Sequence, residues 1–141
     1  MDPDRAAEAP ARPRAIAVLI THDDRILLVR RAASSHLPGY WTPVTGRVEP
    51  DETLEAAAQR EVREEVGLTI ALGTVFHEGT TSDGRFDMTY FDATLIGGTL
   101  RLQIEEVSDA RWLTRAEVTE LTPMLDRTRA AIALSRISPS T

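Results

Sequence analysis

Cysteine and lysine are both missing from this 141-residue sequence, and their absence excludes several kinds of chemistry. Without cysteine there are no disulfide bonds, thiol nucleophiles, thiolate metal sites or iron–sulfur clusters. Because all 16 positively charged residues are arginines, neither a Schiff-base lysine nor a phosphate-loop lysine is available. The three histidines, His22, His36 and His77, lie far apart along the chain, and no serine–histidine–aspartate arrangement stands out.

Long apolar runs are scarce as well. No run approaches the roughly 18 residues that a membrane span needs, and the first residues, Met1 to Arg14, contain no apolar signal core. The formal net charge of −6 argues against the phosphate backbone of a nucleic acid as the main partner. We therefore expect a cytoplasmic protein that associates with neither a membrane nor a nucleic-acid polymer.

The length of the chain suits a single domain with one hydrophobic core. We expect this domain to span residues 13–137, with a flexible N-terminal tail at residues 1–12. A second flexible tail is expected at residues 138–141, where the sequence is short and polar.

Local patterns predict the secondary structure within that domain. Runs of apolar residues separated by turn residues predict strands at residues 14–21, 25–30, 72–78, 86–96, 99–104 and 110–113. Strong helix formers predict helices at residues 53–66, 115–121 and 123–137. Strands with helices placed mid-chain and at the end are typical of an α+β or α/β layered domain.

The helix predicted at residues 53–66 carries a crowded acidic surface. Glu61 and Glu65 are four residues apart and Glu61 and Glu64 are three apart, so their side chains are neighbours on a helix. Such like-charge pairs each destabilise a helix by a few tenths of a kcal/mol, and a divalent cation is the simplest group to offset this. A solvated acidic face, with Arg60 as an ordinary ion-pair partner of Glu64, is the alternative that remains open.

The spacing around these glutamates resembles the Nudix box, G-x5-E-x7-R-E-U-x-E-E-x-G-U, in which U is an apolar residue. Every specified position is filled, by Gly46, Glu52, Arg60, Glu61, Val62, Glu64, Glu65, Gly67 and Leu68. The overlapping segment W-T-P-V-T-G, at residues 41–46, is similar to that of a subset of Nudix proteins. This subset includes dihydroneopterin-triphosphate and dATP pyrophosphohydrolases. The resemblance extends over most of the chain and implies an α/β/α sandwich, with a mixed curved β-sheet between helices.

The resemblance also implies an activity and a set of metal ligands. Nudix enzymes use Mg²⁺ or Mn²⁺ to hydrolyse the diphosphate linkage of a nucleoside diphosphate joined to a group X, such as a nucleoside triphosphate. Carried over by position, the best metal ligands are Glu61 and Glu65, followed by Glu64 and the main-chain carbonyl of Thr45. Glu61 is also a candidate catalytic base, and Thr45 stands where many members have a second glycine.

Other residues are implied to support this chemistry. Arg60 would orient a carboxylate through a bidentate pair, and Glu52 would support the site or a second metal from the helix entrance. The family often recruits an acid from an E-x5-W stretch; Glu106 fits this spacing before Trp112 and is expected to act as a further ligand or base. Glu105 is the alternative to Glu106 at this position.

Candidate substrate contacts come from the segments before the box. Gly46 lets the loop backbone approach the metal and substrate closely, and Thr45 lies beside it. Arg30 is a candidate phosphate ligand, although Arg30 and Arg31 both suit solvated charges at a strand end. Trp41 is a candidate for stacking on a base, or else packs beneath the box.

The sequence leaves competing functions open. The leading expectation is a pyrophosphohydrolase acting on a small nucleotide-like molecule. A catalytically silent Nudix module that binds a nucleotide or a protein is the alternative, and an acidic interaction domain is a third. A homodimer is also expected from the resemblance, because Nudix proteins often form dimers.

Overall fold

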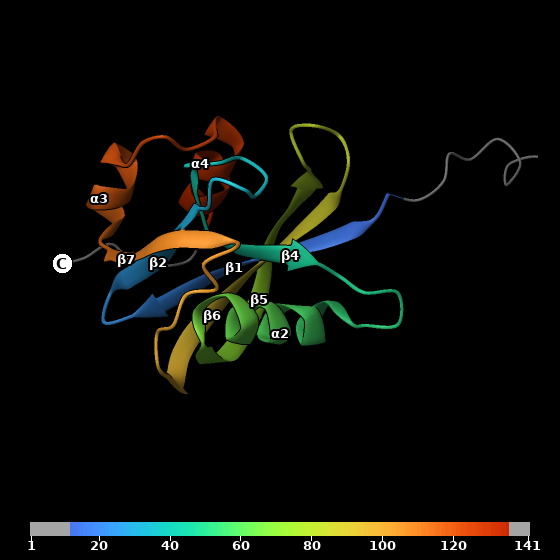
Figure 1. Cartoon of the computed structure of the whole chain (residues 1–141), viewed down its shortest axis with the longest axis horizontal. Coiled ribbons are helices and arrows are strands. Elements are labelled where there is room, and N and C mark those ends of the chain that lie inside the picture. Colours follow the sequence, from blue (N-terminus) through green and yellow to red (C-terminus); the bar gives the residue numbers. More distant parts are fainter. Residues whose placement is uncertain (1–11, 136–141) are drawn as a thin grey trace, which may run out of the picture.

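The computed structural model describes residues 12–135 and has a β-sheet at its centre with helices on both faces (Figure 1). The predicted tail at residues 138–141 and nearly all of that at residues 1–12 lie outside the described residues, as do the last positions of the predicted domain. Within the described part of the chain, no helix is long and apolar enough to cross a membrane.

A 7-stranded mixed sheet forms the central layer. Its main path runs β3-β2-β1-β6-β5, while β4 pairs with β1 and β7 pairs with β2. The pairing of β1 with β6 is parallel and the other pairings are antiparallel. The strands are β1 (Arg14–His22), β2 (Arg25–Arg31), β3 (Trp41–Thr42), β4 (Val44–Arg47), β5 (Leu68–Thr80), β6 (Asp87–Gly98) and β7 (Val107–Leu113).

Strand β1 is buried on both faces, which explains its unbroken apolar sequence. Ile16, Val18 and Ile20 pack with the buried side chains of helix α2 (Leu54–Val66) on one face. Leu19 points the other way and packs with residues of helices α3 (Arg115–Glu120) and α4 (Asp126–Ala133). The predicted α/β/α layering is therefore confirmed, with α2 on one face and α3 and α4 on the other (Figure 1).

Helix α2 begins and ends at the predicted residues. The side chain of Thr53 accepts a hydrogen bond from the N–H of Ala56 at 3.1 Å, which satisfies a donor at the start of the helix. Gly67 adopts a φ of 75°, and its N–H donates to the carbonyl of Arg63. Because this left-handed cap turns the chain sharply, β5 begins at the next residue, Leu68.

The strand predicted at residues 99–104 is wrong. Gly98 turns the chain at a φ of 89°, and the segment then crosses the C-terminal end of α2. The N–H groups of Arg101 and Gln103 donate to the carbonyls of Val66 and Glu65, each at 2.9 Å. Carbonyls at a helix end lack partners within the helix, so this segment caps α2 instead of joining the sheet.

The last helix is shorter than the prediction of residues 123–137. It spans Asp126–Ala133 in the structure. The carbonyl of Pro123 accepts a hydrogen bond from the N–H of Trp41 at 2.9 Å, so the chain before α4 runs along β3 and is not helical. The guanidinium of Arg129 donates to carbonyls at the end of α3, which holds α4 against its neighbour.

Candidate active site

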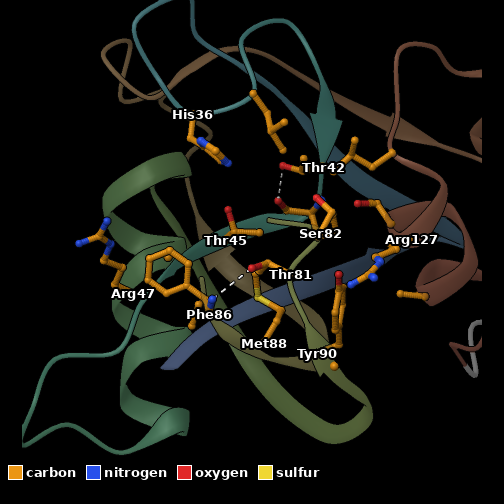
Figure 2. Close-up of a pocket in the computed structure, with 18 of the residues that line it drawn as sticks. His36, Thr42, Thr45, Arg47, Thr81, Ser82, Phe86, Met88, Tyr90 and Arg127 are labelled. Atoms are coloured by element: carbon orange, nitrogen blue, oxygen red, sulfur yellow. Dashed lines mark hydrogen bonds between the residues drawn. The ribbon is translucent and has the colours of Figure 1, made fainter. Parts of the chain in front are cut away.

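A pocket of about 870 Å³ is lined by residues from both faces of the sheet. On the side of the pocket formed by α2, which we call the α2 side, Glu61, Glu64 and Glu65 line the wall together with Glu106. The opposite wall, which we call the α4 side, is formed by the turn between β5 and β6, the start of β6, and α4. Figure 2 shows side chains that line this pocket.

Arg60 forms hydrogen bonds with three glutamates of the box. Its Nε and Nη2 donate to the two carboxylate oxygens of Glu52 at 2.7 and 2.8 Å. Its Nη1 donates to Glu61 at 2.7 Å and to Glu64 at 3.2 Å. The hydrogen bonds from Arg60 lower the pKa of Glu52 to about 2, and Glu52 in turn raises the pKa of Arg60. Arg60 therefore forms the expected bidentate pair with Glu52.

Glu65 is the buried member of the acidic cluster, and Glu61 is partly buried. The side chains of Glu61 and Glu65 are 15% and 3% exposed, whereas that of Glu64 is 51% exposed. Burial raises the pKa of Glu61 against the effect of Arg60, and it raises the pKa of Glu65 to about 7 against the effect of Arg31. Glu64 therefore fits the alternative of a solvated acidic face, whereas Glu61 and Glu65 do not.

Gly46 on β4 lies directly against the carboxylate of Glu61. A Cβ atom added at Gly46 would clash with the side chain of Glu61, which would then have to move from its place beside Arg60. Glycine therefore lets the strand backbone approach that carboxylate closely. Thr45, the preceding residue on β4, also lines the pocket, as does Gly46 itself.

Arg31 is the site residue that the sequence did not single out. It lies at the end of β2, is 9% exposed, and donates to Glu65 at 2.8 Å and to Glu106 at 2.9 Å. It thereby brings Glu106 to the α2 side of the pocket, whereas Glu105 does not line the pocket. Strand alternation places Arg31 on the face of β2 that carries Leu27 and Val29, and this periodicity is the signal that distinguishes it from Arg30.

Two of the expected substrate contacts are not brought to the pocket wall. Arg30 is exposed, and its Nε donates to the carbonyl of Gly39 at 3.3 Å. Trp41 is 4% exposed and belongs to the core between the sheet and the helices α3 and α4. The guanidinium of Arg111 lies over its ring, 4.9 Å from the centroid, so Trp41 packs as a core residue.

The oxygen ligands on the α2 side suit a hard divalent cation. Carboxylates with a nearby main-chain carbonyl are the donors that Mg²⁺ and Mn²⁺ prefer. As the side chains of residues 12–135 are placed, no group of three or more acidic or histidine side chains surrounds one point closely enough to hold a metal ion. Arg60 and Arg31 instead hold oxygens of Glu61, Glu64, Glu65 and Glu106. The donor chemistry therefore fits, and metal binding would require these carboxylates to turn from the arginines.

Comparison with known protein families identifies the arrangement. A family model described as the NUDIX domain matches residues 11–134. The chain belongs to the Nudix family. The MutT protein from Methanosarcina mazei Go1 has the same fold, with a TM-score of 0.77 and 22% sequence identity over 89% of this chain and 94% of that chain. The predicted family and fold are thus confirmed.

Sequence relatives of this Nudix domain are named as hydrolases. The NAD-capped RNA hydrolase NudC of Deinococcus radiodurans is 34% identical over 96% of this chain and 53% of its own length. The CTP pyrophosphohydrolase of Escherichia coli K12 is 43% identical over 41% of this chain and 43% of that protein. The chain spans about half, or less, of the length of the curated relatives that it matches. The predicted hydrolase class is confirmed at the level of the family.

Proposed function

We propose that this protein is a Mg²⁺- or Mn²⁺-dependent pyrophosphohydrolase that cleaves the diphosphate linkage of a nucleoside diphosphate joined to a group X. The observation that supports this function best is the burial of Glu65 and the partial burial of Glu61 on the pocket wall, with Arg31 and Arg60 beside them. Buried carboxylates are costly unless they are paired or bind a cation. Their retention at a pocket of nucleotide size favours a catalytic role.

Each residue of the α2 side has a role in this proposal. Glu61 and Glu65 are the principal metal ligands, assisted by Glu64, Glu106 and the carbonyl of Thr45. A bound divalent cation supplies charge neutralisation at the diphosphate and activation of water. Glu61 is the candidate base, and Arg60 and Glu52 fix the orientation of the carboxylates. Arg31 positions Glu65 and Glu106 through its two ion pairs.

A substrate screen tests the function and identifies X. The panel contains nucleoside triphosphates, nucleotide sugars, dinucleoside polyphosphates, NAD and NAD-capped RNA, since relatives are named for hydrolysis of NAD-capped RNA and of CTP. We expect hydrolysis that requires Mg²⁺ or Mn²⁺ and yields a mononucleotide product. Hydrolysis of none of these compounds with either metal would contradict the proposed activity and leave the silent binding module as the better description.

The cellular location and the assembly remain predictions. We retain the expectation of a cytoplasmic protein that acts on a small nucleotide-like substrate and has no nucleic-acid polymer as its main partner. A homodimer stays a prediction from the family resemblance. Light scattering of the purified chain measures its mass directly, and a value near the 15.5 kDa of one chain would contradict the dimer.

A further inference from the structure

Arg127 differs from Arg31, which also lines the pocket, and from Arg60. The guanidinium groups of Arg31 and Arg60 are occupied by carboxylates. Arg127 lines the α4 side, and its Nη1 donates to the main-chain carbonyl of Thr80 at 2.6 Å. Within residues 12–135, no carboxylate forms an ion pair with Arg127. Its remaining N–H donors are therefore available to a bound molecule.

The wall next to Arg127 is apolar and partly aromatic. Phe86, Met88 and Tyr90 line the pocket there (Figure 2). The N–H of Phe86 donates to the side chain of Thr81 at 3.1 Å, which fixes the residue at the start of this wall. Planar rings and a methionine sulfur make favourable contacts with another flat ring. This wall therefore suits the heteroaromatic base of a nucleotide better than a sugar or a free phosphate.

Tyr90 and Arg127 mark one edge of that wall. Burial raises the pKa of Tyr90 while the positive charge of Arg127 lowers it, so the two groups lie near each other. Figure 2 shows both at the end of the wall away from Phe86 and Arg47. The guanidinium of Arg47 lies over the ring of Phe86, 4.9 Å from its centroid. A base lying along this wall would present its polar edge to Arg127.

From this arrangement we propose that Arg127 is a specificity-determining residue that selects a guanine base over an adenine base. A guanidinium carries only donors, so it matches a base edge with two adjacent acceptors. Guanine offers O6 and N7 as such a pair, whereas adenine places the N6 donor beside N7. The proposal rests on the nucleotide hydrolysis proposed above.

The test compares guanine and adenine nucleotides by rate and by binding. We would measure kcat/KM for GTP and ATP with Mg²⁺, and the affinities of GMP and AMP without metal by calorimetry. The wild type should favour guanine by about tenfold or more in both measurements, as expected for a bidentate contact. Arg127→Met should bring both ratios close to one, and Arg127→Lys should restore part of the preference. Arg101→Gln, which removes an exposed arginine outside the pocket, should leave the ratios unchanged.

The outcomes separate this inference from the proposed function. Equal guanine-to-adenine ratios in the wild type and in Arg127→Met would overturn the role of Arg127. If Arg127→Met lowered kcat/KM and affinity equally for guanine and adenine nucleotides, the role would also be overturned. Loss of the contact with Thr80 would then explain the effect as structural. Failure of the wild type to hydrolyse any nucleotide would contradict the function instead, while the metal-free GMP and AMP affinities would still report on Arg127. If Arg127→Met fails to fold, Arg127→Lys supplies the comparison.

Discussion

At the scale of single residues, the glutamates of the box differ because their surroundings differ. Glu52 faces a guanidinium and an N–H donor, and its pKa is low. Glu65 is buried beside another carboxylate, and its pKa is high despite Arg31. Burial and neighbouring charge, which act in opposite directions here, decide the state of each carboxylate. Identical side chains of one motif are thereby suited to orientation in one case and to ligand binding in the other.

Replacing Glu65 tests its proposed role as a metal ligand. Glu65→Gln keeps the shape of the side chain and removes its negative charge, so kcat/KM should fall by at least about a hundredfold. Glu106 still pairs with Arg31, so the fold should survive. Product release under saturating Mg²⁺ and circular dichroism measure the two effects. The matched control is Glu55→Gln, an exposed glutamate of the same helix, and similar rates in all three proteins would contradict the assignment.

The low pKa of Glu52 predicts a pH dependence of stability. The pKa of Glu52 is about 2 in the folded protein, whereas an unperturbed glutamate has a pKa of 4.5, so the unfolded state takes up the proton first. The stabilisation is therefore complete above about pH 4.5 and is lost as the pH falls toward 2. Urea unfolding of metal-free protein between pH 5 and 3 should show a smaller loss in Glu52→Gln than in the wild type. Parallel pH profiles for the two proteins would be evidence against the Glu52–Arg60 interaction.

At the scale of elements, α2 is held in place at both of its ends. Thr53 caps its first turn, and Gly67 and the segment that follows β6 satisfy its last carbonyls. These contacts stop the helix from fraying at the turn that carries Glu64 and Glu65. Residues 99–104, which cap the helix, lead directly to Glu106, so the same contacts also place the carboxylate of Glu106 at the pocket.

Removing the cap of α2 should cost a measurable free energy of unfolding. Thr53→Ala deletes the acceptor for the N–H of Ala56, and the expected loss is about 1 kcal/mol. Chemical denaturation measures this change. Thr99→Ala, at an exposed threonine outside regular structure, should change the stability by less than about 0.5 kcal/mol. A loss for Thr53→Ala no larger than that for Thr99→Ala would show that the cap does not stabilise the helix.

At the scale of the whole molecule, the pocket joins two chemically different surfaces. The α2 side carries carboxylates, which we propose bind a cation, and the α4 side carries aromatic side chains and the guanidinium of Arg127, which we propose bind a base. The sheet holds α2 and α4 on opposite faces, and the pocket is lined from both. The pocket therefore suits an extended ligand that has a diphosphate at one end, on the α2 side, and a ring at the other end, on the α4 side.

Metal binding should raise the thermal stability of the whole domain. A cation that binds only the folded state at 100 times its Kd adds about 2.7 kcal/mol, which corresponds to a rise in Tm of roughly 5 to 10 °C. Differential scanning calorimetry with and without Mg²⁺, at matched ionic strength, measures this shift. Glu65→Gln should show a smaller rise, and an unmoved Tm in the wild type at millimolar Mg²⁺ would count against the cation site.

The sequence by itself determined the features that depend on near neighbours in the chain. The capping residues of α2, its apolar stripe and the common surface of Glu61, Glu64 and Glu65 follow from helical periodicity, since residues three and four apart must lie together. The apolar runs of the predicted strands, the placement of the predicted helices and the spacing of the box were sufficient for the layered fold and the family.

Only the tertiary structure decided the features that depend on distant segments. Arg31 pairs with residues 34 and 75 positions away. Strand alternation groups Arg31 with Leu27 and Val29, but it does not show which face of β2 the helix covers. The expected strand at residues 99–104 caps α2 because unpaired helix carbonyls lie beside it. Arg127 lies beside the wall formed by Phe86, Met88 and Tyr90 only because α4 lies against the end of β5. Such contacts arise from packing between elements, which local propensity does not encode.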